Sequence, residues 1–469
     1  MARHFLHGEF STFYWGQPYG GTPEVALTAA LFWLAGSSTT TLRLVPLALY
    51  AVSALVVWRI GRRTTGEPAA TVAALLFWVW PAYFVWRSTR EYGYYGVLLL
   101  AGVLVLLLAL RLRERPNAVD AAAFGVVLGY GWWTSVQIVL VAAPALAWLA
   151  WRQPRVWRYG PLVASAACVA ASPWLSWSVG HDWKSLHPYA GPPSSYGFRL
   201  GGFFVDALPS AVGVRVLFVR DWLPAPVAGE ILFAALCIAL LAVLVRRRRS
   251  LELVLAILVP FPFVYALSPF TGDRIEPRYL VLLAPLLCLV LAPLLTDLRV
   301  AAIGLAGVLA LTVVALLRLR DSGGIAPGAP DVRAPVHIDP LLSALERRDV
   351  TRAWADYWVA FRVTFLTNER IVAAPTRTPR YPRYNALVGA ADHPAHIFVA
   401  GTSEEAPQRA ELLREGYERL RAGDFFVYVP RGQLRPTPLS RASRFARDPE
   451  VPRHRRRALR RDPDVEMNG

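Results

Sequence analysis

The sequence predicts an all-α polytopic membrane domain with about ten transmembrane helices, followed by a small external α/β domain at the C-terminal end. The 469-residue chain is 55% hydrophobic with a mean hydropathy of +0.36, so it is more apolar than soluble globular proteins. The excess lies in long blocks between residues 40 and 318. Arginine-rich stretches separate several of these blocks, as expected for a polytopic membrane protein.

Ten apolar blocks are candidates for spanning helices, because a hydrocarbon core of about 30 Å needs about 20 mostly apolar residues. They lie near residues 41–60, 69–86, 92–111, 118–134, 136–151, 160–179, 227–245, 251–269, 278–295 and 299–317. Basic stretches follow the first, third, fifth and seventh blocks, at 59–63, 111–115, 151–158 and 246–249. Since basic loops stay cytoplasmic, the first forty residues and the chain after residue 320 are predicted to lie outside.

The net charge of +17 does not indicate a nucleic-acid partner. The basic residues lie at the ends of apolar blocks and in the tail from about Arg431 onward, a pattern explained by membrane topology and solvation. Cys168, Cys237 and Cys288 fall inside apolar blocks without metal-ligand spacing and are predicted to be small buried hydrophobes.

Three domains are expected: a membrane domain at 1–319, an external α/β domain at 320–435 and a basic disordered tail at 436–469. In the second domain the residue pattern predicts helices at 339–348 and 404–423 and strands at 370–375, 395–400 and 424–430.

The chain opens with an aromatic, glycine-rich stretch, "FYWGQPYGGTPE" (13–24), followed by "PEVALTAALFWLA" (23–35). The latter is too short to span and predicts an interfacial helix with Pro23 in its first turn. Because this external segment has no spanning helix before it, we expect the natural chain to begin upstream with one more such helix.

Polar residues in the external loops are candidates for chemistry, since polar groups near bilayer depth are costly. In the first loop Gly16, Gly20 and Gly21 would let the backbone approach a ligand closely. Tyr14, Gln17, Tyr19 and Glu24 offer polar groups there, and an aromatic belt is the alternative interpretation.

Two further loops contain charged groups. Arg87, Arg90 and Glu91 stand at the mouth of two spans, where they form either a structural ion pair or a site that binds metal or substrate. Arg278 and Tyr279 precede a late span and could hold a lipid phosphate or act as a snorkelling anchor.

Four stretches resemble the protein-mannosyltransferase-like family 39 glycosyltransferases of the GT-C superfamily, in a bacterial form. They are "GQPYGGTPEVALTAALFWLAGSSTTTLRLVPLAL" (16–49), "WRSTREYGYYGVLLLAG" (86–102), "EPRYLVLLAPL" (276–286) and "YWVAFRVTFLTNERIVAAP" (357–375). Their order along residues 10–430 carries the resemblance, more than any single motif does.

The resemblance implies an integral plasma-membrane enzyme that takes a sugar from a polyprenyl-phosphate carrier. It would pass this sugar, with inversion, to a protein, lipid or polysaccharide acceptor at the outer face. A divalent metal, Mg²⁺ or Mn²⁺, is the candidate cofactor. The family places a catalytic Asp in the first external loop, whereas this sequence has no Asp before Asp120. Either a missing first helix with its loop or an inactive copy would explain the difference, and we favour the former.

The resemblance also implies roles for particular residues. Glu91 matches the acidic residue of the second loop, which binds metal or orients the donor, and Glu24 is the other catalytic candidate. The substrate-binding candidates are Gln17, Tyr19, Arg90, Arg278 and Tyr279. The metal candidate is Glu91.

Two other functions fit a polytopic chain. A transporter or lipid flippase would have internal repeats and charges at the bilayer midplane, whereas the charges here lie at the ends of the spans. A scaffold that binds cell-wall components through its external domain would transfer no sugar.

Overall fold

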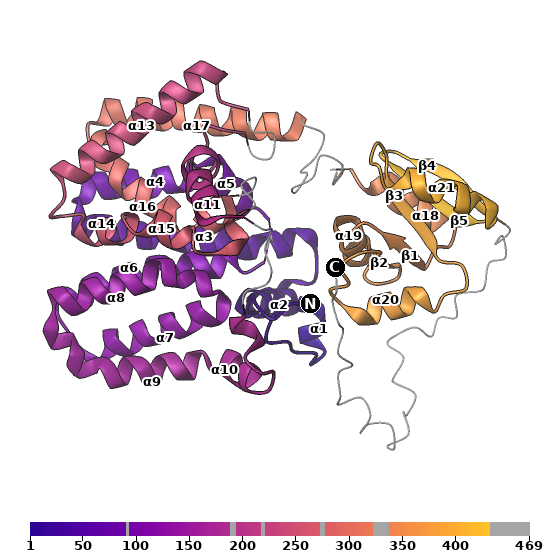
Figure 1. The fold of residues 1–469 in the computed structure, drawn as a ribbon, viewed down its shortest axis with the longest axis horizontal. Coiled ribbons are helices and arrows are strands. Elements are labelled where there is room, and N and C mark those ends of the chain that lie inside the picture. The colour runs from indigo at the N-terminus through magenta and orange to yellow at the C-terminus, as the bar shows by residue number, and fades with distance from the viewer. Residues whose placement is uncertain are drawn as a thin grey trace.

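The computed structural model describes residues 1–90, 93–187, 194–216, 221–272, 277–321, 335 and 337–431. Most helices lie side by side in one bundle, and an α/β domain lies beyond one end of that bundle (Figure 1). The chain therefore has the fold class that its sequence predicted: a helical domain followed by a small domain containing a sheet.

Four continuous helices in the described part of the chain are long and apolar enough to cross a membrane. They are α3 (Thr39–Thr64), α6 (Tyr95–Glu114), α13 (Pro226–Arg246) and α17 (Leu298–Asp321). The number rises to six if each of two bent helix pairs is one crossing.

The remaining helices of the bundle are shorter. They are α4 (Glu67–Val79), α5 (Ala82–Ser88), α7 (Ala118–Thr134), α8 (Val139–Arg152), α9 (Gly160–Ala170), α10 (Ser172–Val179), α11 (Tyr196–Gly202), α12 (Leu208–Ala211), α14 (Glu252–Leu258), α15 (Phe261–Tyr265) and α16 (Leu283–Leu291).

The ten predicted segments all coincide with helical residues, although several are shorter or broken. The second segment bends by 70° between α4 and α5, where Pro81 lacks the N–H that a continuous helix needs. The described residues therefore contain fewer continuous crossings than the ten predicted, because apolar composition reports burial in lipid or protein and does not reveal such breaks.

The basic stretches of the sequence meet at one end of the bundle. Arg63 forms an ion pair with Glu114, and Arg152 forms one with Glu252. These residues end α3, α6 and α8 and begin α14, and Figure 1 places this end away from the α/β domain. The arginine-rich helix ends therefore lie at one end of the bundle, and the α/β domain lies at the other.

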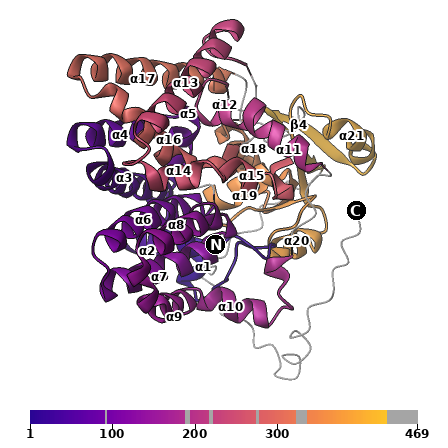
Figure 2. The same cartoon turned by 60° about the vertical axis from the view of Figure 1, so that its left-hand side comes forward.

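The first helices lie between the bundle and the α/β domain. They are α1 (Ala2–Leu6) and α2 (Pro23–Ala35). The short helix predicted at 23–35 is confirmed, with Pro23 as its first residue, where its missing N–H costs no hydrogen bond. Both views place α1 close to α20 (Pro382–Gly389) of the α/β domain (Figures 1 and 2).

The α/β domain is built on one five-stranded sheet in the order β2-β1-β3-β5-β4. Its strands are β1 (Arg352–Ala355), β2 (Val372–Pro375), β3 (Ala395–Val399), β4 (Tyr417–Ala422) and β5 (Phe425–Pro430). Its helices are α18 (Asp339–Arg347), α19 (Tyr357–Leu366), α20 and α21 (Glu405–Arg414). The first three strands of this order are parallel, and β5 pairs antiparallel with both of its neighbours.

The helix predicted at 404–423 is wrong in its second half. The helix α21 ends at Arg414, and β4 follows as the first strand of a hairpin with β5. Gly416 and Gly423 have positive φ angles of 88° and 61°, which glycine adopts without strain. The Gly423–Asp424 pair is a two-residue hairpin signal that outweighed the helical periodicity.

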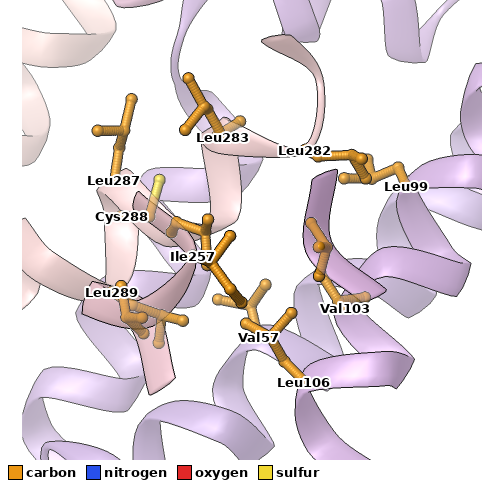
Figure 3. Packing of buried hydrophobic residues seen from close by; sticks show 14 of the residues in the cluster. Val57, Leu99, Val103, Leu106, Ile257, Leu282, Leu283, Leu287, Cys288 and Leu289 are labelled. Carbon is orange, nitrogen blue, oxygen red and sulfur yellow. The ribbon is translucent and has the colours of Figure 1, made fainter. Parts of the chain in front are cut away.

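The core of the bundle is apolar and closely packed. In Figure 3, Val57 of α3, Val103 of α6, Ile257 of α14 and Cys288 of α16 lie together, all nearly inaccessible to solvent. The sequence prediction of a buried thiol is confirmed for Cys288 but is wrong for Cys168, which is exposed on α9.

Small residues of the stretch "GVVLGYG" (125–131) let α7 and α9 approach closely. A β-carbon on Gly125 would lie 2.3 Å from the Val163 carbonyl oxygen, and one on Gly129 would lie 2.2 Å from that of Ala167. The two helix backbones therefore touch, and no larger residue fits at either glycine.

Candidate functional site

The opening loop (residues 13–24) is held against the end of α7. Gly21 N–H donates to the Thr134 carbonyl at 3.0 Å, and the Trp133 indole donates to the Thr12 carbonyl at 2.9 Å. A β-carbon on Gly21 would lie 2.3 Å from the Trp133 carbonyl oxygen. The predicted close approach by this glycine is therefore made to protein backbone, not to a ligand.

A tyrosine–arginine cluster lies beside this loop, at the start of α6. It consists of Tyr19, Tyr94, Tyr95, Arg278 and Tyr279. The Arg278 guanidinium carbon is 5.0 Å from the Tyr279 ring centroid, and the Arg278 side chain reaches the Tyr279 hydroxyl. The rings of Tyr94 and Tyr95 stack with centroids 4.7 Å apart.

Electrostatic contacts join the members of the cluster. The charge of Arg278 interacts electrostatically with the hydroxyl groups of both Tyr94 and Tyr279. The hydroxyl group of Tyr19 interacts electrostatically with that of Tyr279. A guanidinium fork surrounded by phenolic hydroxyl donors suits a phosphate, whose oxygens accept several hydrogen bonds at once. Three of the predicted substrate-binding residues, from the first and the last external loops, thus meet here.

Gln17 adjoins the cluster through Gly20. A β-carbon on Gly20 would lie 2.5 Å from the Tyr94 ring and 3.1 Å from the Gln17 side-chain nitrogen. The side chains of Gln17 and Tyr94 therefore flank one glycine, which has a φ of 72°. The amide of Gln17 is available at the edge of the cluster.

Glu24 has a position that the sequence did not predict. Glu24 is only 1% exposed. Its carboxylate accepts hydrogen bonds from the Gly96 and Val97 N–H groups at 3.1 and 3.2 Å. These are orphan donors of the first turn of α6, where the helix dipole also favours a carboxylate. This geometry favours a positioning role for Glu24, tying α2 to α6, over proton transfer.

Arg90 lies in a different environment from Arg278. Its guanidinium carbon is 5.0 Å from the Trp86 ring centroid. Partial burial and the neighbouring guanidinium groups of Arg43 and Arg362 lower the pKa of Arg90. The structure therefore groups Arg90 with other arginines and gives it no contact with the tyrosine–arginine cluster in the described residues.

Glu91, the catalytic and metal-binding candidate, lies outside the described residues. Within the described ranges no three His, Cys, Asp or Glu side chains gather in a way that could hold a metal ion.

A cavity of about 310 Å³ separates the opening loop from the α/β domain. Its walls come from α1, the opening loop, α2, α19 and α20, and its volume lies within the range of small-molecule sites. Gln17 lines this cavity and also adjoins the tyrosine–arginine cluster, so the two sites meet at one side chain.

His4 connects the first helix to the α/β domain at the edge of this cavity. Its two ring nitrogens lie 2.7 Å from a Glu9 oxygen and 3.1 Å from a Glu369 oxygen. The second nitrogen is also 3.1 Å from the Tyr384 hydroxyl. Alongside, the Trp15 ring stacks on Tyr381 with centroids 3.9 Å apart.

The contacts with Glu9 and Glu369 shift the pKa of His4. Burial alone would lower the pKa of His4, but hydrogen bonds to Glu369 and Glu9 outweigh it and raise that pKa above 6.5. The hydrogen bond from His4 lowers the pKa of Glu369. The imidazolium between two carboxylates is thus stabilised by folding.

We expect the thermal unfolding temperature to depend on His4 between pH 5 and 8. A raised folded-state pKa gives stability that is fully present below pH 6.5 and is lost as the pH rises through the folded-state value. His4→Gln should flatten the profile of unfolding temperature against pH. His393→Gln, at an exposed histidine, is the matched control, and equal slopes in both variants would contradict the assignment.

The sequence did not single out His4, Tyr94 or Tyr384. A histidine five residues from a glutamate in a polar first segment is too common to select, and its second carboxylate, Glu369, is 365 residues away. Tyr94 lies within residues 86–102, a stretch that resembles the family, and this resemblance was the only sequence signal that could have selected it.

Comparison with known proteins gives one family match over part of the chain. Residues 22–177 match the family model of the dolichyl-phosphate-mannose-protein mannosyltransferases. No curated protein sequence matches the chain.

Solved structures match most of the chain. ArnT from Cupriavidus metallidurans is similar in its apo state, with a TM-score of 0.58, and bound to undecaprenyl phosphate, with a TM-score of 0.61. Both matches have 13% sequence identity and cover 91% of this chain and 91% of ArnT. The Archaeoglobus fulgidus oligosaccharyltransferase complex with Zn and sulfate has a TM-score of 0.46 at 15% identity, over 92% of this chain and 68% of that chain. The chain therefore shares its fold with ArnT and, over residues 22–177, matches the family model of the dolichyl-phosphate-mannose-protein mannosyltransferases, in keeping with the resemblance in its sequence.

Proposed function

We propose that this chain transfers a sugar from a polyprenyl-phosphate carrier to an acceptor at the outer face of the plasma membrane. The tyrosine–arginine cluster is the observation that supports this most, because it offers one cation and several hydroxyl donors to a single phosphate. The fold shared with ArnT, whose structure was solved with undecaprenyl phosphate, supports a lipid phosphate as the ligand.

In the proposed reaction the bond between the anomeric carbon and the phosphate oxygen breaks, and its electron pair stays on the phosphate. Arg278 and the neighbouring hydroxyl groups stabilise the developing negative charge from fixed positions. The acceptor oxygen attacks the opposite face of the sugar, which inverts the anomeric configuration. Its proton passes to a carboxylate base, a role that the family resemblance gives to an Asp of the first external loop, whereas it gives Glu91 the role of binding metal or orienting the donor.

Glu24 and Gln17 would support this reaction from either side of the opening loop. Glu24 fixes α2 on the first turn of α6, directly after Tyr94 and Tyr95. Gln17 lies between the phosphate cluster and the cavity, where it could hydrogen-bond the sugar hydroxyl groups. A divalent metal, for which Glu91 is the ligand that the sequence resemblance implies, would supply further positive charge.

An outer-face location, with several membrane crossings and an external C-terminal domain, is part of the proposal. It is supported by the position of the basic ends, which meet at the opposite end of the bundle from the α/β domain (Figure 1). The tyrosine–arginine cluster lies at the end nearer that domain, since the opening loop contacts both.

The test uses the purified full chain in lipid nanodiscs. Undecaprenyl phosphate should bind at least about tenfold more tightly than undecaprenol, since the charge-assisted contacts need the phosphate. Nanodiscs supplied with lipid-linked sugars extracted from native membranes should release free undecaprenyl phosphate, detected by mass spectrometry. Equal binding of the phosphate and the alcohol would overturn the proposal.

A further inference from the structure

The opening loop forms a short hairpin whose base is fixed on the bundle. Phe13 pairs with Gly21 in an antiparallel bridge, and the Tyr14 N–H donates to the Gly20 carbonyl at 2.9 Å. The Gly21 N–H in turn bonds to the end of α7. Residues 15–19, the hairpin tip, lie beyond these base contacts, so the base alone does not determine where the tip points.

The α/β domain holds the hairpin tip. The Trp15 ring stacks on Tyr381, directly before α20, with ring centroids 3.9 Å apart and planes within 17° of parallel. The Arg380 guanidinium donates to the Gly16 carbonyl at 3.1 Å. A β-carbon on Gly16 would lie 2.8 Å from the Arg380 α-carbon and carbonyl oxygen, so the two backbones are in contact. Two consecutive residues of the tip thus meet two consecutive residues of the domain.

Hydrogen bonds from the segment before the hairpin reach the same domain. The second ring nitrogen of His4 lies 3.1 Å from both a Glu369 oxygen and the Tyr384 hydroxyl. The Tyr381 hydroxyl donates to the Glu9 carboxylate at 3.1 Å. Together with the contacts of the tip, these bonds form a clasp that joins α1 and the hairpin tip to the α/β domain.

The same tip also adjoins the tyrosine–arginine cluster. A β-carbon on Gly20 would lie 2.5 Å from the Tyr94 ring and 3.1 Å from the Gln17 side-chain nitrogen. At the base of the hairpin, the Tyr14 ring packs edge-on to the Tyr94 ring with centroids 6.2 Å apart. Tyr19 of the tip is itself a member of the cluster. One short segment is therefore held by the α/β domain and supplies side chains to the proposed donor site.

The clasp matters because the tip has little to order it from within. Fixing the backbone of each residue costs conformational entropy, which its contacts must outweigh. Gly16 and Gly20 have φ angles of 66° and 72°, and glycine loses more conformational freedom on ordering than any other residue. Gln17 lies between these two glycines, so its position depends on contacts that its neighbours make. Misplacing a positioning group by about 1 Å lowers a rate by about 100-fold.

We propose that the α/β domain positions the donor site, by clasping the hairpin tip so that Gln17 and Tyr19 stay in place at the tyrosine–arginine cluster. Arg380 and Tyr381 are positioning residues that act through the tip. Gly16 and Arg380 are 364 residues apart along the chain, so this task belongs to the assembled protein and not to the membrane domain alone. The role rests on the proposed function, because it gives the α/β domain a part in that reaction.

Gly16→Ala tests the proposal in the purified full chain in nanodiscs. The added β-carbon would collide with the Arg380 backbone and push the tip away from the α/β domain. The kcat for release of undecaprenyl phosphate from lipid-linked sugar should fall about tenfold or more, because the sugar loses its oriented partners. Binding of undecaprenyl phosphate should change about twofold or less, since Arg278, Tyr94 and Tyr279 lie outside the tip.

Gly416→Ala is the matched control. Gly416 also has a positive φ, of 88°, but an added β-carbon there meets no atom within 4 Å. The control therefore introduces a similar backbone strain without a collision, and it should keep the kcat of the wild type. A Gly16→Ala protein with the wild-type kcat would overturn the inference. An equal decrease in both variants would also overturn it, because strain alone would then explain the effect.

A second pair of variants weakens the clasp without a collision. Tyr381→Leu removes the ring that stacks on Trp15, together with the hydroxyl that bonds Glu9, and should lower kcat about three- to tenfold. Tyr381→Phe keeps the ring and should restore kcat to within about twofold of the wild type. Equal kcat values in the leucine and phenylalanine variants would mean that the stack does not position the tip, which contradicts the inference.

The inference and the proposed function fail in different ways. If the wild type binds undecaprenyl phosphate no better than undecaprenol, the proposed function fails and the inference falls with it. If the wild type shows that preference and Gly16→Ala matches it in both binding and kcat, only the inference fails. Loss of undecaprenyl phosphate binding in Gly16→Ala would mean that the tip holds the phosphate itself, which overturns the positioning role.

Discussion

Replacing Arg278 with glutamine is expected to lower sugar transfer by about 100- to 1,000-fold, the usual cost of removing one preorganised donor from a site of developing charge. The phosphate gains negative charge as the glycosyl bond breaks, and the Arg278 guanidinium lies in the tyrosine–arginine cluster where that phosphate is proposed to sit. Glutamine keeps a hydrogen-bond donor of shorter reach but removes the charge.

The measurement is the rate at which undecaprenyl phosphate is released from lipid-linked sugar, at several donor concentrations. Because Arg278 binds the phosphate more strongly as charge develops, kcat should fall more than the KM for the donor rises. Arg299→Gln, an exposed arginine in the first turn of α17, is the matched control and should retain full activity. A higher KM with an unchanged kcat would instead make Arg278 an anchor for the ground-state lipid only.

Replacing Gly129 with valine is expected to destabilise the bundle by about 3 kcal/mol, the upper part of the range for overpacking. The added β-carbon would lie 2.2 Å from the Ala167 carbonyl oxygen and 2.8 Å from the Ala170 β-carbon. The first of these atoms belongs to the backbone of α9, so no side-chain rotation can relieve the clash. The helices α7 and α9 would have to separate along their length.

Thermal unfolding of the purified full chain measures this effect. Gly307→Ala on α17 is the matched control, because its added β-carbon meets no atom within 4 Å and alanine is the better helix former. The control should leave the unfolding temperature unchanged or slightly raised. A Gly129→Val protein as stable as the control would mean that α7 and α9 are not in contact.

The sequence predicted much of the candidate site, but not the geometry of each member. Arg278, Tyr279 and Tyr19 were selected from loops more than 250 residues apart because Arg–Tyr chemistry suits phosphate, and the structure brings them together. Arg90 and Glu24 were selected by the same reasoning, and their roles remain predictions. The structure shows Arg90 beside Trp86 and shows Glu24 accepting hydrogen bonds from the first turn of α6. The residue type limits what chemistry is available, whereas packing determines which groups face one another.

The sequence by itself determined the membrane class, the helical segments, the short helix after the opening loop and the family resemblance. These follow from local quantities: hydropathy, charge at segment ends, and proline or glycine at fixed offsets. Only the tertiary structure decided that Glu24 bonds to the first turn of α6 and that His4 bridges to Glu369. Such electrostatic and hydrogen-bonding contacts depend on distances in space, and separation along the chain does not encode them.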